Sequence, residues 1–125
     1  MRAPREDYDA AAQAAANVFE AVIKQDRSIC KDSFLDGAVI FGQTNGQPNV
    51  GLYENLLKQI DESNVGPEFN YRVDVVALED TIALVQVLEN NFHGNYYTVY
   101  CTEMKVGGQW KIGSFIYNQN KEAYK

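Results

Sequence analysis

The sequence is short of the residues on which the commonest site chemistries depend. Of its 125 residues, one is histidine and two are cysteine. Cys30 and Cys101 lie far apart and lack the spacing of a metal or redox motif. Nucleophile motifs, phosphate-binding loops and metal-ligand clusters are also absent from the sequence. We therefore predict no cofactor and no metal, and we expect two reduced thiols in place of a disulfide.

Basic residues are outnumbered as well, with 11 Lys and Arg against 17 Asp and Glu, for a net charge of −6. Nucleic acids and anionic membranes bind clustered Lys and Arg, so neither is an expected partner. The longest apolar run, Ile82–Leu88, is interrupted by Gln86 and is far too short to span a bilayer. Residues 1–7 show no apolar signal segment. A cytoplasmic location is expected, although a signal removed beforehand would leave no trace.

The length and the 46% of hydrophobic residues fit one globular domain over residues 1–125. Three stretches show helical features: Asp7–Gln25, a short stretch from Asp26 to about Phe34, and Gly51–Ser63. Ala38–Gly42 is typical of a short strand. After Pro67 the period changes to two, which predicts the strands Phe69–Leu78, Thr81–Phe92, Tyr96–Val106 and Gln109–Asn118. Helices followed by an antiparallel meander indicate an α+β fold.

Four features in this order carry a resemblance to a known superfamily. They are the Ala-rich first helix with Asp26, the segment Phe34–Ala38, Gly51 before the next helix, and the two runs Tyr97–Tyr100 and Lys105–Ile112. The chain resembles the nuclear transport factor two-like superfamily, in particular the families called "putative lumazine-binding" and SnoaL-like polyketide cyclase-like. The resemblance implies a cone-shaped, cystatin-like α+β fold. In it, three N-terminal helices pack on a curved antiparallel sheet and enclose a small-molecule pocket.

The sequence departs from the family pattern at two positions. Gly37 stands where the family usually has alanine, and Val99 stands where the putative lumazine-binding pattern tends to have aspartate. Lumazine binding does not follow from the family name, because a fold does not fix a function.

Strand alternation sorts the sheet residues by face, and the steroid isomerases of the superfamily indicate which set faces the helices. The inward set would be Val18, Val22, Ala83, Val85, Val87, Glu89, Thr98, Tyr100, Thr102, Met104, Phe115 and Tyr117. Asp36 at a strand entrance and the hydroxyl of Tyr53 are further candidates for ligand contacts. The set describes an apolar pocket with a few polar groups, as ligand sites usually are. The alternative is that these side chains simply fill the core.

The reactions known in the superfamily each need particular catalytic residues. When the chain is matched to the steroid isomerases, Val18, Gly42 and Thr102 stand where the catalytic groups of those enzymes would be, which excludes steroid isomerisation. His93, the single histidine that a dehydratase could use, falls in a predicted hairpin turn. Arg72 and Asp74 could pair on one strand face, as a simple ion pair and not as an epoxide hydrolase site.

Glu89 is the one ionisable group predicted to point inward. A carboxyl in an apolar pocket has a raised pKa and can act as an acid or a base. The alternative places Glu89 at a solvated pocket rim. Three hypotheses follow: a domain that binds an apolar, ring-containing small molecule, an enzyme of the cyclase, isomerase or dehydratase kind with Glu89 as acid–base, or a dimerising protein-association module.

The same alternation predicts an apolar outer sheet face, which three helices cannot cover in addition to the inner one. An antiparallel sheet normally shows a polar outer face. A two-fold contact between copies would bury such a patch, so we expect a homodimer. The predicted outer set is Leu84, Leu88, Phe92, Tyr97, Val99, Cys101, Trp110, Ile112 and Ile116.

Overall fold

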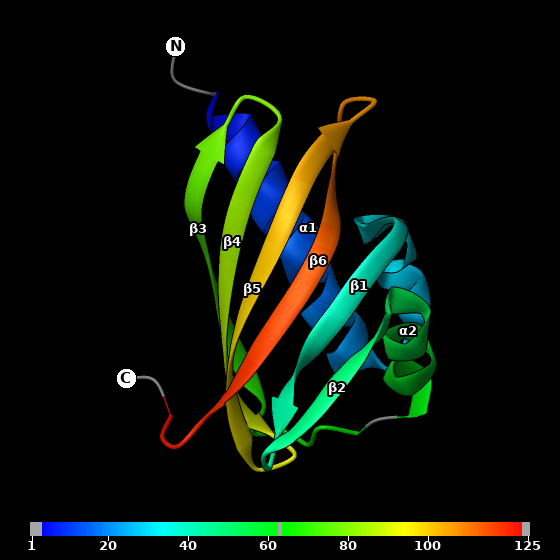
Figure 1. Cartoon of the computed structure of the whole chain (residues 1–125), viewed down its shortest axis with the longest axis vertical. Helices are drawn as coiled ribbons and strands as arrows, with labels where there is room; N and C mark the ends of the chain where they lie inside the picture. Colours follow the sequence, from blue (N-terminus) through cyan, green and yellow to red (C-terminus); the bar gives the residue numbers. More distant parts are fainter. Residues whose placement is uncertain (1–3, 63, 124–125) are drawn as a thin grey trace.

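The first helix, α1 (Arg5–Lys24), lies along one face of a curved six-stranded sheet (Figure 1). The computed structural model describes residues 4–62 and 64–123. Small side chains on the buried face of α1 let the helix approach the sheet closely, and Val18 and Phe19 fill the space beyond them. The buried alanines are Ala11, Ala14, Ala15 and Ala21. No helix among the described residues is long and apolar enough to cross a membrane.

Two short 3₁₀ turns, η1 (Arg27–Ile29) and η2 (Lys31–Ser33), stand where one short helix was predicted. The chain then forms β1 (Phe34–Thr44), a turn, β2 (Gln47–Leu52) and α2 (Tyr53–Glu62). The third predicted helix therefore begins two residues later than expected, and Ser63 lies outside the described residues. The prediction missed β2, which pairs antiparallel with β1 through a turn whose residues both have positive φ.

The remaining strands are β3 (Asn70–Glu79), β4 (Ile82–Phe92), β5 (Asn95–Val106) and β6 (Gln109–Asn120). The strand order is β2-β1-β6-β5-β4-β3. Only the β1–β6 contact is parallel; every other neighbouring pair is antiparallel. This arrangement confirms the predicted α+β cone. Its helical part differs, with two α-helices and two 3₁₀ turns among the described residues where three helices were predicted.

The inward set on β4 was predicted correctly: Ala83, Val85, Val87 and Glu89 are all buried. On β5 the prediction was wrong by one residue. Residues directly opposite each other in an antiparallel pair share a face, and Glu89 is opposite Tyr97. A register irregularity between Glu89 and Phe92 sets this pairing, and a one-residue slip turns a whole strand over. The inward residues are thus Tyr97, Val99, Cys101 and Glu103, whereas Thr98, Tyr100, Thr102 and Met104 point outward.

A bulge in β6 accounts for a second group of wrong orientations. Thr102 pairs with Ser114 and Glu103 with Ile112, so Gly113 is the extra residue. The bulge lets Ile112 and Phe115, three residues apart, face inward together. Phe92 is also turned inward, where its ring contacts Phe69 and Tyr97. Of the predicted outer set, the structure places Phe92, Tyr97, Val99, Cys101, Trp110 and Ile112 inside the fold.

Both cysteines are buried and unpaired, in agreement with the predicted thiols. Burial raises the pKa of the Cys30 thiol to about 11, and it raises the pKa of Cys101 well above its ordinary value. Neither thiol is therefore ionised at neutral pH, and both act as small apolar core residues.

Candidate functional site

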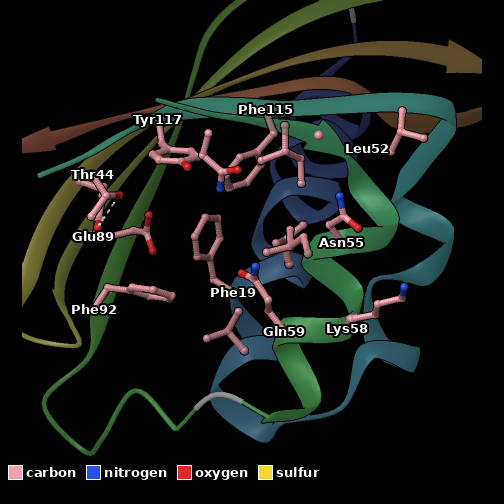
Figure 2. Close-up of a pocket in the computed structure, with 17 residues that line it drawn as sticks. Phe19, Thr44, Leu52, Asn55, Lys58, Gln59, Glu89, Phe92, Phe115 and Tyr117 are labelled. Carbon is pink, nitrogen blue, oxygen red and sulfur yellow. Dashed lines mark hydrogen bonds between the residues drawn. The ribbon is translucent and has the colours of Figure 1, made fainter. Parts of the chain in front are cut away.

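A pocket of about 510 Å³ lies between α1, α2, the β1–β2 hairpin and the inner face of the sheet (Figure 2). Five of the predicted inward residues line it, namely Val18, Val22, Glu89, Phe115 and Tyr117. The other lining residues are Phe19, Ile40, Thr44, Asn49, Gly51, Leu52, Asn55, Leu56, Lys58, Gln59, Phe92 and Tyr97. Most of these belong to the hairpin and α2, so missing β2 hid one wall of the pocket.

The other predicted site residues lie elsewhere. Val85 and Val87 are completely buried in the core. Asp36 is exposed, and the ring of Tyr53 stacks on Phe34 at 5.0 Å between centroids. Their predicted place in the pocket lining was wrong. So was that of Tyr100, Thr102 and Met104, which stand on the opposite face of the sheet.

Aromatic rings form much of the pocket wall. Phe19 on α1 stacks on Phe115 with 6.0 Å between centroids. Tyr97 meets both Phe92 and Tyr117 edge-on, at 5.9 Å each. Such contacts hold the rings in fixed orientations and present flat apolar surfaces to a ligand.

Gly42 makes room for one of these rings. A Cβ added there would lie 2.4 Å from the backbone oxygen of Tyr117 and 2.5 Å from its ring. Gly42 is not among the residues with positive φ, so close approach, and not backbone conformation, accounts for the glycine. Without a side chain at Gly42, the Tyr117 ring lies against β1 and leaves the pocket open.

Glu89 brings a carboxyl group to this apolar site. Its side chain extends from β4 into the pocket, between Thr44 and Phe92 in Figure 2. The residue is 6% exposed, and no hydrogen bond found among the described residues reaches its carboxyl. Desolvation raises the pKa of Glu89 to about 8. The group is therefore mostly protonated at neutral pH, and it can both donate and accept a proton near that pH.

Two residues with hydroxyl groups line the pocket together with Glu89. The hydroxyl of Tyr97 is 3.2 Å from that of Thr44, and Tyr97 is directly opposite Glu89 in the β4–β5 ladder. Both hydroxyls belong to residues that line the pocket. We call Glu89, Tyr97 and Thr44 the polar corner. Sequence alternation alone could not find it, because it depends on the β4–β5 register and on where β1 ends.

The opposite rim of the pocket is polar and open to water. Asn49 on β2 and three residues of α2, Asn55, Lys58 and Gln59, are exposed and line the pocket. A second pocket of about 390 Å³ lies alongside, and it shares Val22, Leu56, Gln59 and Phe92 with the first. A ligand thus has an apolar interior, one polar corner and a hydrated rim.

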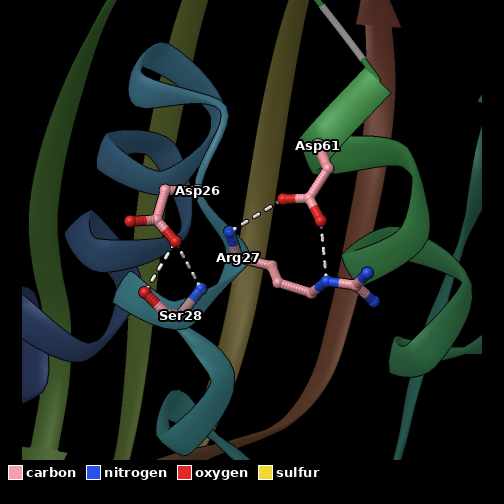
Figure 3. A network of polar contacts seen from close by, with 4 residues as sticks. All are labelled: Asp26, Arg27, Ser28 and Asp61. Carbon is pink, nitrogen blue, oxygen red and sulfur yellow. Dashed lines mark hydrogen bonds and ion pairs between the residues drawn. The ribbon is translucent and has the colours of Figure 1, made fainter.

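A polar network fixes α2, which forms one wall of the pocket (Figure 3). Nε of Arg27 lies 2.7 Å from a carboxylate oxygen of Asp61, and the backbone N–H of Arg27 donates to the same side chain at 3.1 Å. Asp26 accepts from the hydroxyl and the backbone N–H of Ser28, which lowers the pKa of Asp26. Asp26 therefore caps the 3₁₀ turn η1.

Two candidates that the sequence raised lie away from the pocket. Arg72 and Asp74 form an ion pair of 2.8 Å at the surface, as expected for a simple pair. His93 is exposed in the β4–β5 turn, also as expected, with its ring against Phe92. Within residues 4–62 and 64–123, no group of three or more His, Cys, Asp or Glu residues could hold a metal ion.

A helix-covered curved sheet with a pocket against its inner face defines the NTF2-like class of folds, and solved structures agree. An NTF2-like protein from Shewanella baltica OS155 has a TM-score of 0.85 at 22% identity, over 98% of this chain and 100% of that one. A ketosteroid isomerase-like protein from Erwinia carotovora atroseptica SCRI1043 has a TM-score of 0.69 at 20% identity, over 95% and 100%. At these identities the likeness shows the fold alone.

Sequence comparison identifies the family within that class. Residues 6–118 match the family described as "putative lumazine-binding", and the chain belongs to it. A curated relative, the aldolase FrzH of a Cladobotryum species, is 30% identical over 113 residues, which is 90% of each chain.

Proposed function

We propose that this protein binds a small, largely apolar, ring-containing molecule in the pocket and moves a proton on it with Glu89. The observation that carries the proposal is the carboxyl of Glu89, which is 6% exposed and points into an apolar cavity. Among the lining residues it is the sole acid. A single carboxyl with a pKa near the working pH is suited to general acid–base catalysis.

The curated relative favours chemistry next to a carbonyl group. FrzH is named an aldolase. An aldol reaction removes a proton from a carbon beside a carbonyl. Ionised Glu89 would take that proton, and the C–H electron pair would become the double bond of an enolate. The resulting carboxylic acid would then return the proton to carbon or to oxygen.

Prodan, a naphthalene ketone with C–H bonds beside its carbonyl, can test this proposal. We expect its fluorescence to report binding, and we expect the protein to speed deuterium uptake at that carbon in heavy water. Glu89→Gln keeps the shape of the side chain and removes its base. This variant should still bind Prodan, while catalysed uptake falls by about 10²- to 10⁴-fold, the range for general-base catalysis, or to the background rate.

Glu103→Gln is the matched control, because Glu103 is equally buried but does not line the pocket. Its deuterium uptake should equal that of the unaltered protein. Failure of Prodan to bind would overturn the proposal as a whole. Equal uptake by the Glu89→Gln variant would remove the acid–base role of Glu89.

Binding without turnover is the second candidate function. It is favoured by the absence of a second acid among the lining residues. Prodan that binds to the unaltered protein but takes up deuterium only at the background rate would support this candidate. A ligand carried through purification would then be visible by native mass spectrometry.

The homodimer through the outer sheet face stays a prediction. Fewer apolar side chains lie on that face than the sequence predicted. The structure leaves Tyr100, Met104 and Ile116 outward, at 39%, 43% and 37% exposure. Hydrogen-bonded polar pairs such as Thr102 and Ser114 lie among them. The molar mass in solution, measured by light scattering, tests the prediction, and a monomer would contradict it.

A further inference from the structure

The hydroxyl pair in the polar corner has one hydrogen-bond donor to spare. Each hydroxyl carries one O–H, and one of the two is used in the contact of 3.2 Å between Tyr97 and Thr44. Whichever residue donates in that contact, the O–H of the other remains. No further hydrogen bond of either hydroxyl is found among residues 4–62 and 64–123. Both residues that could carry the remaining donor line the same pocket as Glu89.

Separate contacts hold each hydroxyl in place. Thr44 ends β1, and the next residue, Asn45, donates its backbone N–H to the side chain of Gln119 at 2.6 Å. The amide of Gln119 in turn donates to Asn95 at 3.0 Å, which ties the hairpin tip to β5 and β6. Tyr97 is 7% exposed, and its ring is held edge-on by two neighbouring aromatic rings. The corner is thus rigidly positioned, as a specific site requires.

Tyr71 shows that the arrangement around Tyr97 is not a general consequence of strand pairing. Tyr71 is opposite Glu89 on the other side, in the β3–β4 ladder. Its hydroxyl, however, donates to Glu20 on α1, and Tyr71 does not line the pocket. Of the two tyrosines that flank Glu89, Tyr71 pairs with a carboxylate on α1 and lies outside the pocket lining, whereas Tyr97 pairs with a hydroxyl and lines the pocket.

We infer that Glu89, Tyr97 and Thr44 form a binding site for one oxygen atom of the ligand, and that the ligand is a ketone or an aldehyde. The inference rests on the proposed function and specifies its substrate class. A protonated carboxyl and the spare hydroxyl supply two donors, and a carbonyl oxygen offers two lone pairs. A carbonyl brings no proton of its own that would need an acceptor in the corner. A hydrocarbon there would leave both donors buried without a partner, which is costly.

A carbonyl oxygen bound at the polar corner would also place the adjoining carbon of the ligand near Glu89. For the reaction Glu89 has to be ionised; its carboxylate then takes the proton from that carbon, while the spare hydroxyl donates to the oxygen and stabilises the negative charge that develops there. The residue that carries the spare hydroxyl, Tyr97 or Thr44, would then act as a catalytic donor, and the aromatic wall would orient the rest of the molecule.

Prodan reports directly on this site, because hydrogen bonds to its carbonyl shift its emission to the red. The variant Tyr97→Phe with Thr44→Val removes both hydroxyls and keeps similar shapes. We expect the emission of bound Prodan to move to the blue and its affinity to fall about 3- to 10-fold, the loss of a hydrogen bond. The affinity for dimethylaminonaphthalene, which lacks the carbonyl, should stay the same.

Tyr71→Phe is the matched control and should leave both the emission and the affinity unchanged. Circular dichroism establishes that each variant is folded. Thr44→Val alone, at the end of β1, provides a milder second variant, with a smaller shift in the same direction. Unmoved emission in the folded double variant, with Prodan still bound and exchanging deuterium, would overturn this inference and leave the proposed function standing. Prodan that does not bind the unaltered protein at all would overturn both.

Discussion

Two buried glutamates on the inner face of the sheet differ in what they face. Glu89 and Glu103 are 6% and 4% exposed, and desolvation raises the pKa of each to about 8. Both oxygens of Glu103 are buried without a hydrogen-bond partner among the described residues. Glu89 faces a pocket, whereas Glu103 is opposite Ala83 and Ile112 in the packed core. A raised pKa therefore records burial, and only the cavity marks a candidate site.

The two ends of the molecule differ in the same way: the end with Glu103 is closely packed, and the end with Glu89 contains the pocket. Near Glu103, Asp7 of α1 accepts from Lys105 at 2.9 Å and from the indole N–H of Trp110 at 3.2 Å. These hydrogen bonds lower the pKa of Asp7 and fasten the start of α1 to β5 and β6. At the other end, the β1–β2 hairpin and α2 form one wall of the pocket (Figure 2). We refer to the closed end and the pocket end.

The largest expected effect is on the pH dependence of stability. Each glutamate has a pKa raised from 4.5 to about 8 on folding, so the unfolded chain binds fewer protons between these values. The free energy of unfolding should therefore fall as pH rises through this window, by about 1.4 kcal/mol per pH unit for each glutamate. Below pH 4.5 and above about pH 8, these two groups add no further slope.

Glutamine substitutions separate the two contributions, since glutamine does not titrate. Urea unfolding across the window should show about half the slope for Glu103→Gln or Glu89→Gln, and almost none for the double variant. Relative to the unaltered protein at the same pH, the double variant should gain the most stability near pH 8. If one single variant kept the full slope, that glutamate would be hydrated in solution, and the two sites would differ in burial as well as in surroundings.

A smaller effect should distinguish the packing of the two ends. Ile112 is completely buried at the closed end, so Ile112→Ala should cost about 2–5 kcal/mol, from lost burial and a new cavity. Leu56 is partly buried at the pocket end and already lines a cavity, so Leu56→Ala should cost roughly 1 kcal/mol. Urea unfolding at one pH measures both. Equal losses would mean that the pocket end is packed as tightly as the closed end.

The sequence predicted Glu89 for a sound reason. On β4 the alternation from Ala83 to Glu89 is unbroken, so the apolar set identified the inner face and Glu89 came with it. The same rule failed on the next strand, because the irregularity before Phe92 shifts the pairing by one residue. The failure on β6 has a similar cause, in the bulge at Gly113. Alternation is reliable within a regular strand, and it cannot be carried across a turn or a bulge.

Local sequence was enough to predict the α+β class, the order of the longer elements and the buried faces of α1 and β4. These follow from local periodicity and from residue preferences that act over a few neighbouring positions. The pairing of the β1–β2 hairpin with β6, and the pocket that α2 and this hairpin enclose, depend on contacts that form only in the folded chain. The polar corner belongs to this second group. Thr44, Glu89 and Tyr97 lie on three strands, and their meeting depends on strand register, which is set by contacts between residues far apart in the chain.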